Sequence, residues 1–550
     1  MFAGSLWLTL ATVAVASEPR PQVQIRTGIV QGVTEAATKV DAYKGIPYAK
    51  PPIGNLRWRA PVPAPAWKGV RDARSFGHSC LQPPYPPTSV YFGDIASPSE
   101  DCLTLNVWAP SGARKLPVMV WIHGGGLLRG GSSEPMYDGG KMAQQGIIVV
   151  SINYRLGLLG FFAHPALSAE SAQRVSGNYG LLDQIEALRW VRDNIAEFGG
   201  DPSQVTIAGE SAGGLSVVSL LASPLAHGLF GRAIVQSAYM QTNRALRDDV
   251  LGLRSAEAEG EALAKAAGVS TAAALRAADP VKLFMAGLAS KWGPEPVIDG
   301  VVLPRELFET FAHGEQAKVP IIAGFNEGEI RSLLYFMPSD IPANRAAYEA
   351  DVRRRFGAEA DDFLAVYPGV DPREDVMASI RDGACDWTAQ ALVRRQAEAG
   401  LPSYLYYFRH STPSQRALDL AAFHASELPY IFGQVGESAA LGPNWPRPPF
   451  SNAESQLADA MMGYWVSFVR DGIPTASNMP PWPRYTTEQR GYLDIDEQPS
   501  AARDLHPGAF AFADRLIQTR RQQGRGWRLD IGFSAFSVDD PAAARQPDNP

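Results

Sequence analysis

One hexapeptide has the composition and setting expected of a nucleophilic serine. Gly209-Glu210-Ser211-Ala212-Gly213-Gly214 lies between a run rich in β-branched residues, 204–208, and an apolar helical run, 215–221. A strand that turns sharply into a helix strains the backbone of the central serine, and small residues two positions away let the chain fold back without a clash. The helix also directs its positive end and free N–H groups toward an anion formed beside the serine. The pattern therefore predicts a nucleophile elbow that exposes the hydroxyl of Ser211.

A glycine loop follows another apolar run, residues 117–122. It reads His123-Gly124-Gly125-Gly126, and three glycines allow backbone N–H groups to approach a bound carbonyl oxygen closely. Donors fixed at that point stabilise the oxyanion of a tetrahedral intermediate. Alone, the loop could be an ordinary glycine turn, but together with the elbow it favours acyl transfer.

A serine hydroxyl is a poor nucleophile until a base accepts its proton, so this chemistry requires a histidine and an acid that orients it. In hydrolases with this elbow the chain order is serine, acid, histidine. The histidines that follow the elbow are His227, His313, His410, His424 and His506. Order and spacing do not choose among them.

The elements that must position these residues alternate between strands and helices. Short runs typical of buried strands occur at residues 117–122, 146–153, 204–208, 232–236 and 320–325. Between the second and third runs, apolar residues from 182 to 198 recur at three- and four-residue spacing, which indicates a helix. The alternation predicts an α/β fold with a mainly parallel sheet between two helical layers, and a site at the carboxyl ends of the strands. We expect surface helices at 256–278 and a helical insertion at 333–400.

Length and composition restrict the function further. A usual domain size of roughly 150 residues would divide the 550 residues into three or four units, but no linker or repeat interrupts residues 23–533, so we expect one catalytic domain. Fifty Lys and Arg against 57 Asp and Glu give a net charge of −7, which argues against a nucleic-acid partner. Three cysteines, without CxxC or HExxH spacing, give no support for a metal site, and no motif indicates a cofactor.

The two ends of the chain differ from the rest. Residues 6–15 are almost wholly apolar and lead into Ala14-Val15-Ala16, so we predict a signal peptide at 1–16 and a secreted or periplasmic protein. Because no Lys or Arg precedes the apolar run, an ordinary buried N-terminal segment is the alternative. No later run reaches the ~20 residues of a membrane span. Residues 536–550 lack apolar content, and we expect a disordered tail.

Further motifs give the chain a family resemblance. They are YKGIPYA at 43–49, EDCL and LNVW within 100–108, GNYGLLDQ at 177–184 and FGGDP at 198–202. With the elbow and the glycine loop, these motifs resemble the type-B carboxylesterase and lipase family, which includes the cholinesterases. The resemblance covers nearly the whole chain. It implies the α/β-hydrolase fold, with a large, mainly parallel central sheet, helices on both faces and added insertions.

The resemblance also implies the missing site residues. The family's acid follows a Gly-x-Asn segment, and GFNEGE at 324–329 matches it with Glu329, although Glu327 is a competing assignment. The family's histidine lies in a segment that matches FHASELPY at 423–430, which implies His424 as the base. By the same resemblance the oxyanion N–H groups belong to Gly125, Gly126 and Ala212, and His123 is structural.

The cysteines fit the same family. Cys80 and Cys102 match its N-terminal disulfide, which implies an oxidising compartment. Cys385 remains as a buried, unreactive thiol.

The resemblance implies a serine carboxylic-ester hydrolase that forms an acyl-enzyme on Ser211 and acts on a small-molecule ester. One alternative is a non-catalytic binding protein, because the fold has relatives that lost the nucleophile. Another keeps the triad but cleaves an amide or a carbamate. The sequence does not indicate the natural substrate or the oligomeric state.

Overall fold

The structure is a computed structural model, and it describes residues 20–35, 38–93, 97–290, 292–333, 340–437, 439–528 and 531–533. The predicted signal peptide at 1–16 and the predicted tail at 536–550 lie outside the described residues. Within the described ranges, no helix combines the length and apolar content needed to cross a bilayer.

The centre of the molecule is an 11-stranded sheet with the order β14-β13-β12-β11-β10-β9-β7-β8-β6-β4-β3. Every neighbouring pair from β8 through β7, β9, β10, β11 and β12 to β13 is parallel, and the pairs toward both edges are antiparallel. The bounds are β3 Val33–Glu35, β4 Val40–Pro47, β6 Thr104–Pro110, β7 Leu116–Ile122, β8 Ile148–Ile152, β9 Gly200–Glu210, β10 Arg232–Gln236, β11 Ile321–Asn326, β12 Ser403–Phe408, β13 Gly491–Ile495 and β14 Ser500–Arg503.

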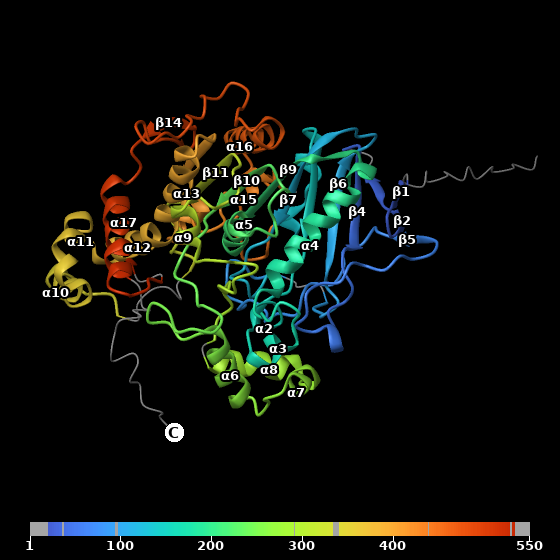
Figure 1. The fold of residues 1–550 in the computed structure, drawn as a ribbon. Coiled ribbons are helices and arrows are strands. Elements are labelled where there is room, and N and C mark those ends of the chain that lie inside the picture. Colours follow the sequence, from blue (N-terminus) through green and yellow to red (C-terminus); the bar gives the residue numbers. More distant parts are fainter. Residues whose placement is uncertain are drawn as a thin grey trace, which may run out of the picture.

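Seventeen α-helices surround this sheet in the described part of the chain (Figure 1). They are α1 Gly140–Gln144, α2 Gly157–Phe161, α3 Pro165–Glu170, α4 Tyr179–Asn194, α5 Ala212–Ala222, α6 Ala256–Ala266, α7 Ala272–Ala277, α8 Pro280–Ala289, α9 Leu307–Ala312, α10 Arg345–Phe356, α11 Ala360–Val366, α12 Pro372–Arg381, α13 Trp387–Glu398, α14 Pro413–Ala417, α15 Leu428–Ile431, α16 Asn452–Asp471 and α17 Pro507–Gln522. Helices α4, α5 and α13 pack on one face of the sheet, and α1 and α16 pack on the other.

Each face of the sheet has its own apolar core, because successive side chains of a strand point to opposite sides. In β7, Val118 and Val120 belong to the core beneath α4, α5 and α13, whereas Met119 and Trp121 belong to the core beneath α1 and α16. All four side chains are buried. A strand covered on both faces reads as a continuous apolar run, which is why residues 117–122 could be recognised in the sequence. The predicted α/β fold with helices on both faces is confirmed.

The predicted insertions are helical as well. Residues 256–278 form α6 and α7, which gather with α8, α2 and α3 at the lower edge of Figure 1. The second insertion contains α10 to α13 between strands β11 and β12. The basic run in α10 forms ion pairs on the surface, including Arg353 with Asp361 at 2.8 Å and Arg354 with Asp351 at 2.5 Å. These charges form a solvated helix face.

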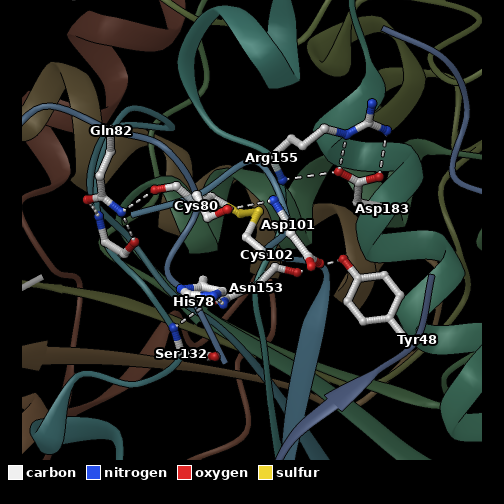
Figure 2. Close-up of a disulfide and its surroundings, with 12 residues drawn as sticks. Tyr48, His78, Cys80, Gln82, Asp101, Cys102, Ser132, Asn153, Arg155 and Asp183 are labelled. Carbon is white, nitrogen blue, oxygen red and sulfur yellow. Dashed lines mark hydrogen bonds and ion pairs between the residues drawn. A yellow bond between two sulfur atoms is a disulfide. The ribbon is translucent and has the colours of Figure 1, made fainter. Parts of the chain in front are cut away.

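A second, three-stranded sheet lies beside the edge of the large sheet that contains β3 and β4 (Figure 1). The small sheet has the order β1-β2-β5, with bounds Gln22–Ile25, Gly28–Gln31 and Val70–Asp72. The disulfide joins Cys80 to Cys102, as the resemblance implied (Figure 2). Cys385 is free and buried. We call residues 80–102 the disulfide loop.

A buried ion pair lies next to this disulfide. Arg155 donates from Nε and Nη2 to the two oxygens of Asp183, each at 2.7 Å, and neither side chain is exposed by more than 3% (Figure 2). Bidentate geometry lets the attraction offset the cost of removing both charges from water. The pair fixes the segment after β8 to α4.

Candidate active site

The elbow residue Ser211 stands between β9, which ends at Glu210, and α5, which begins at Ala212. Its backbone has φ 57° and ψ −123°, a conformation that L side chains rarely adopt. The chain turns so tightly here that a Cβ at position 213 would lie 2.0 Å from the carbonyl oxygen of Ile122, so only glycine fits. The strained turn forms as predicted. The predicted exposure of the hydroxyl is not found, because Ser211 is buried where the glycine loop packs against it.

The glycine loop follows β7 and lies against this serine. A Cβ at Gly124 would lie 3.1 Å from the Cβ of Ser211, so the missing side chain lets the two backbones meet. Within the described part of the chain, the N–H groups of Gly125, Gly126 and Ala212 donate to no protein acceptor. Free N–H groups on the elbow and on a loop packed against it are the kind of donors that can bind an oxyanion.

His123, the first residue of this loop, is held by the surrounding structure. Its Nδ1 contacts the carbonyl oxygen of Gly124 at 2.9 Å, and its ring stacks on Tyr154 at 4.5 Å. Burial lowers the pKa of His123 to about 4, so the imidazole is neutral at physiological pH. Its position and charge state support a structural role.

Two loops at the carboxyl end of the sheet bring Glu329 and His424 together. Gly328 and Phe423 form a parallel bridge, in which the Gly328 N–H donates to the carbonyl of Ala422 at 2.8 Å. This bridge places the next residue of each loop side by side, and Nδ1 of His424 is hydrogen-bonded to Oε2 of Glu329. The other oxygen of Glu329 accepts from the backbone N–H of Asn326 at 2.8 Å.

The competing residues lie elsewhere. The side chain of Glu327 is exposed, whereas that of Glu329 is fully buried. His410 contacts Glu454 at 3.2 Å, and His506 contacts Asp386 at 3.1 Å. The geometry therefore groups Glu329 with His424, as the resemblance implied.

The second ring nitrogen of His424 faces the elbow. Its Nε2 lies 3.1 Å from Oε1 of Glu210, the residue that precedes Ser211. Among the described residues no hydrogen bond joins the hydroxyl of Ser211 to His424. Catalytic hydrogen bonds are often long before substrate binds. Here Nε2 is held beside the residue that precedes the nucleophile.

Buried carboxyl groups control the protonation of this imidazole. Desolvation lowers the pKa of His424, but the negative charges of Glu210 and Glu329 outweigh it and raise the pKa to about 9. Burial in turn raises the pKa of Glu210 to about 8, and the neighbouring Glu427 adds to this effect. The protonation of His424 is therefore coupled to that of Glu210.

Replacing Glu210 by glutamine tests this coupling. The amide keeps the shape but removes a negative charge that stabilises the imidazolium, so the pKa of His424 should fall. Since the base must be unprotonated to act, the acid limb of the kcat/KM–pH profile should move to lower pH, by about one pH unit. Glu327→Gln changes an exposed carboxylate two residues before Glu329. It should leave the acid limb of the kcat/KM–pH profile at the same pH. An unchanged limb in Glu210→Gln would show that Glu210 does not influence the base.

A further buried network supports residues 423–430, the segment that carries His424, which we call the histidine loop. Glu427 accepts hydrogen bonds from the side-chain amides of Gln236 at 2.9 Å and Asn326 at 2.5 Å. Gln236 also accepts from Nε1 of Trp465 at 3.0 Å, and Asn326 donates to the carbonyl of Phe423 at 3.0 Å. The network joins the ends of β10 and β11 to the segment that carries His424.

Sequence reasoning did not assign roles to Glu210 or Glu427. Both lie inside motifs that were recognised, the elbow and the segment FHASELPY at 423–430. A charged residue in an otherwise small or apolar motif was the available signal, because buried carboxylates need partners.

The chain is similar to known proteins over most of its length. A sequence profile of the carboxylesterase family matches residues 19–513. The chain is 37% identical over 500 residues to the fumonisin B1 esterase of Sphingopyxis macrogoltabida, covering 88% of each protein. It is 35% identical over 488 residues to the para-nitrobenzyl esterase of Bacillus subtilis (strain 168), covering 86% of this chain and 95% of that protein. A solved structure of a PNB esterase superposes with a TM-score of 0.75 at 32% identity, covering 92% of this chain and 99% of that one.

Proposed function

Because this chain belongs to the carboxylesterase family, we propose that it hydrolyses esters through an acyl-enzyme on Ser211, with His424 as general base and Glu329 as the acid that orients it. The protein is a serine carboxylesterase, and its substrates are small carboxylic esters. The observation that carries the assignment is the position of the His424 ring. It is hydrogen-bonded to Glu329 through Nδ1, and its Nε2 lies beside the elbow.

The first half of the reaction acylates the serine. The oxygen of Ser211 forms a bond to the ester carbonyl carbon while Nε2 of His424 accepts the hydroxyl proton. The N–H groups of Gly125, Gly126 and Ala212 stabilise the negative oxygen of the tetrahedral intermediate. The proton then passes to the alcohol oxygen as the carbon–oxygen bond breaks, and the alcohol leaves.

The second half repeats these steps with water. His424 accepts a proton from water, whose oxygen attacks the acyl carbon, and the collapse of this intermediate returns the proton to Ser211. The acid product leaves and the free enzyme is restored. Glu329 orients His424 through Nδ1 and stabilises the imidazolium that forms in each half.

The bond that is cleaved can be tested with matched substrates. p-Nitrophenyl butyrate and butyric acid p-nitroanilide carry the same acyl group, but the amine of the anilide must be protonated before it leaves. We expect the ester to be hydrolysed much faster, and both rates to disappear in Ser211→Ala. An anilide rate equal to or above the ester rate would favour an amide hydrolase that uses the same triad.

A further inference from the structure

The disulfide loop contacts the segment that continues the glycine loop. The side-chain amide of Gln82 donates to the carbonyl of Gly130 at 2.7 Å, and its oxygen accepts from the N–H of Gly130 at 2.8 Å. Gln82 is buried, so this paired contact is shielded from water. Arg129 adds a hydrogen bond to the carbonyl of Pro84 at 3.3 Å. One end of the disulfide loop is thereby fixed to the segment that continues the glycine loop.

The same loop contacts the histidine on the other side of the site. The hydroxyl of Tyr91 donates to the backbone carbonyl of His424 at 2.9 Å and lies 2.7 Å from the hydroxyl of Ser332. Because a phenol has one proton, Tyr91 donates to His424 and accepts from Ser332. Ser332 lies three residues after Glu329. One hydroxyl therefore joins the disulfide loop to the loops that carry the proposed base and its acid.

The ring of Tyr91 is held in place by its neighbours. It packs edge-on against Trp445 at 6.1 Å, and Trp445 contacts Phe423, the residue before His424, at 5.0 Å. The side-chain amide of Asn444 donates to the carbonyls of Pro87 at 2.7 Å and Ser89 at 2.9 Å. The loop is thus docked on the segment that follows the histidine, and the position of the phenol oxygen is set by packing.

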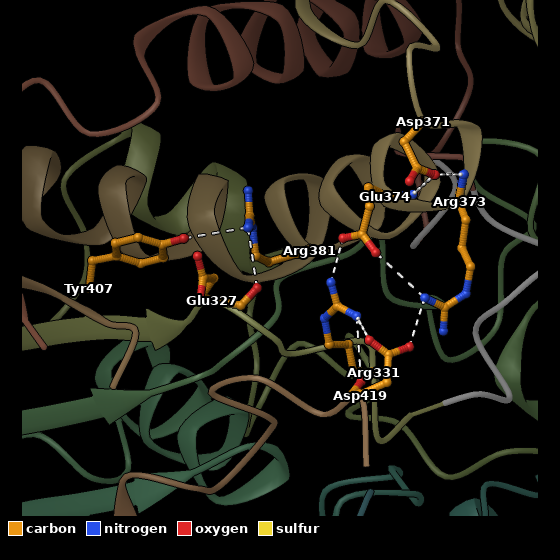
Figure 3. Close-up of polar contacts among 8 residues, drawn as sticks. All are labelled: Glu327, Arg331, Asp371, Arg373, Glu374, Arg381, Tyr407 and Asp419. Atoms are coloured by element: carbon orange, nitrogen blue, oxygen red, sulfur yellow. Dashed lines mark hydrogen bonds and ion pairs between the residues drawn. The ribbon is translucent and has the colours of Figure 1, made fainter. Parts of the chain in front are cut away.

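A charged cluster joins Arg331, which precedes Ser332, to Asp419, which lies five residues before His424 (Figure 3). Arg331 contacts Asp419 at 2.6 Å and also pairs with Glu374, while Arg373 contacts Asp419 at 2.9 Å. The side chain of Asp419 is 61% exposed, so water and salt screen these pairs and each contributes little to positioning. The contact of Tyr91 is made to the backbone of His424 itself, and it should have the greater effect on the base.

We propose that Tyr91 is a positioning residue for His424, and that the disulfide loop holds the glycine loop and the histidine loop in register across the site. The inference rests on the role proposed above for His424. The hydrogen bond from Tyr91 fixes the backbone carbonyl of His424, and with it the distance from the imidazole to Ser211. Tyr91 acts on the imidazole through the backbone of His424, so its loss should affect the chemical step and not substrate binding.

The test is the Tyr91→Phe variant of the full chain, which keeps the ring and removes only the hydroxyl. We expect kcat for p-nitrophenyl butyrate to fall about three- to tenfold with KM unchanged, the loss expected for one hydrogen bond. The rate constant for phosphorylation of Ser211 by diisopropyl fluorophosphate should fall by the same factor. Tyr85→Phe is the matched control, because Tyr85 lies in the same loop with its ring 6.1 Å from that of Tyr91, and it should keep the full kcat.

The outcomes separate this inference from the proposed function. If Tyr91→Phe has the wild-type kcat and phosphorylation rate while Ser211→Ala is inactive, the positioning role is wrong and the proposed function stands. If Ser211→Ala remains active, the proposed function itself fails. A fall in kcat accompanied by an equal loss in Tyr85→Phe would also overturn the role, because it would reflect a general disturbance of the loop.

Discussion

Replacing Ser211 by alanine is expected to lower kcat for p-nitrophenyl butyrate by on the order of 10⁶-fold. The substitution removes the only atom that forms the acyl-enzyme, while the oxyanion donors and the binding surfaces remain. KM should change little, and the thermal midpoint should not fall. Steady-state kinetics with enough enzyme to detect the residual rate measure the loss.

Ser219→Ala provides a matched control on the same helix. The hydroxyl of Ser219 is buried and donates to the carbonyl of Leu215 at 2.8 Å, so its loss disturbs the helix without touching the site. The control should retain wild-type kcat. Near-wild-type activity in Ser211→Ala would contradict the assignment of the nucleophile.

Glu329→Gln is expected to lower kcat by roughly 10⁴-fold. Glutamine has nearly the same shape, but it removes the charge that stabilises the imidazolium, and its amide can hold the histidine in the wrong tautomer. Since the carboxylate of Glu329 is fully buried and bonded to Nδ1 of His424, no solvent ion can replace it. The kcat of the purified variant measures the effect.

Glu327→Gln decides between the two carboxylates that the sequence left in competition. Its side chain is exposed, and its backbone N–H still donates to the carbonyl of Phe408 at 2.8 Å after the substitution. Activity should therefore be unchanged in this variant. A loss of the order expected for Glu329→Gln would move the acid to Glu327.

The elbow and the glycine loop were predictable because each is a continuous stretch of chain next to one strand. Their chemistry depends on local backbone geometry, and glycine spacing records that geometry directly. The acid and the base could not be predicted from a local pattern, because 95 residues separate Glu329 from His424. Their meeting depends on the parallel bridge between Gly328 and Phe423, which no local pattern encodes. Only the family resemblance could name them in advance.

The central strands of the sheet were predictable because each is a continuous local run of apolar residues. The edge strands were not predictable in this way. The central strands β7, β8, β9, β10 and β11 all occur at predicted runs, since burial on both faces demands continuous apolar sequence. The edge strand β14 and the small-sheet strand β5 are short and largely exposed, so they lack that signal. The run SYLYYF of β12 is fully buried, but aromatic runs of this length fit a helix as well as a strand.

The contacts that support the site join residues far apart in the sequence, so they could not be predicted from the sequence. Glu210 acquires its raised pKa from burial beside other carboxyl groups, and Tyr91 reaches His424 from 333 residues away. Both effects depend on which loops meet above the sheet. They can be recognised only when side-chain positions are known.

The most direct test of the central claim is mass spectrometry of the protein after inactivation by diisopropyl fluorophosphate. A serine activated by His424 and Glu329 is the group that should displace fluoride from phosphorus. We expect one diisopropylphosphoryl group per chain, located on the peptide that contains Ser211, and loss of esterase activity in proportion to labelling. Complete inactivation with an unmodified Ser211 would contradict the account.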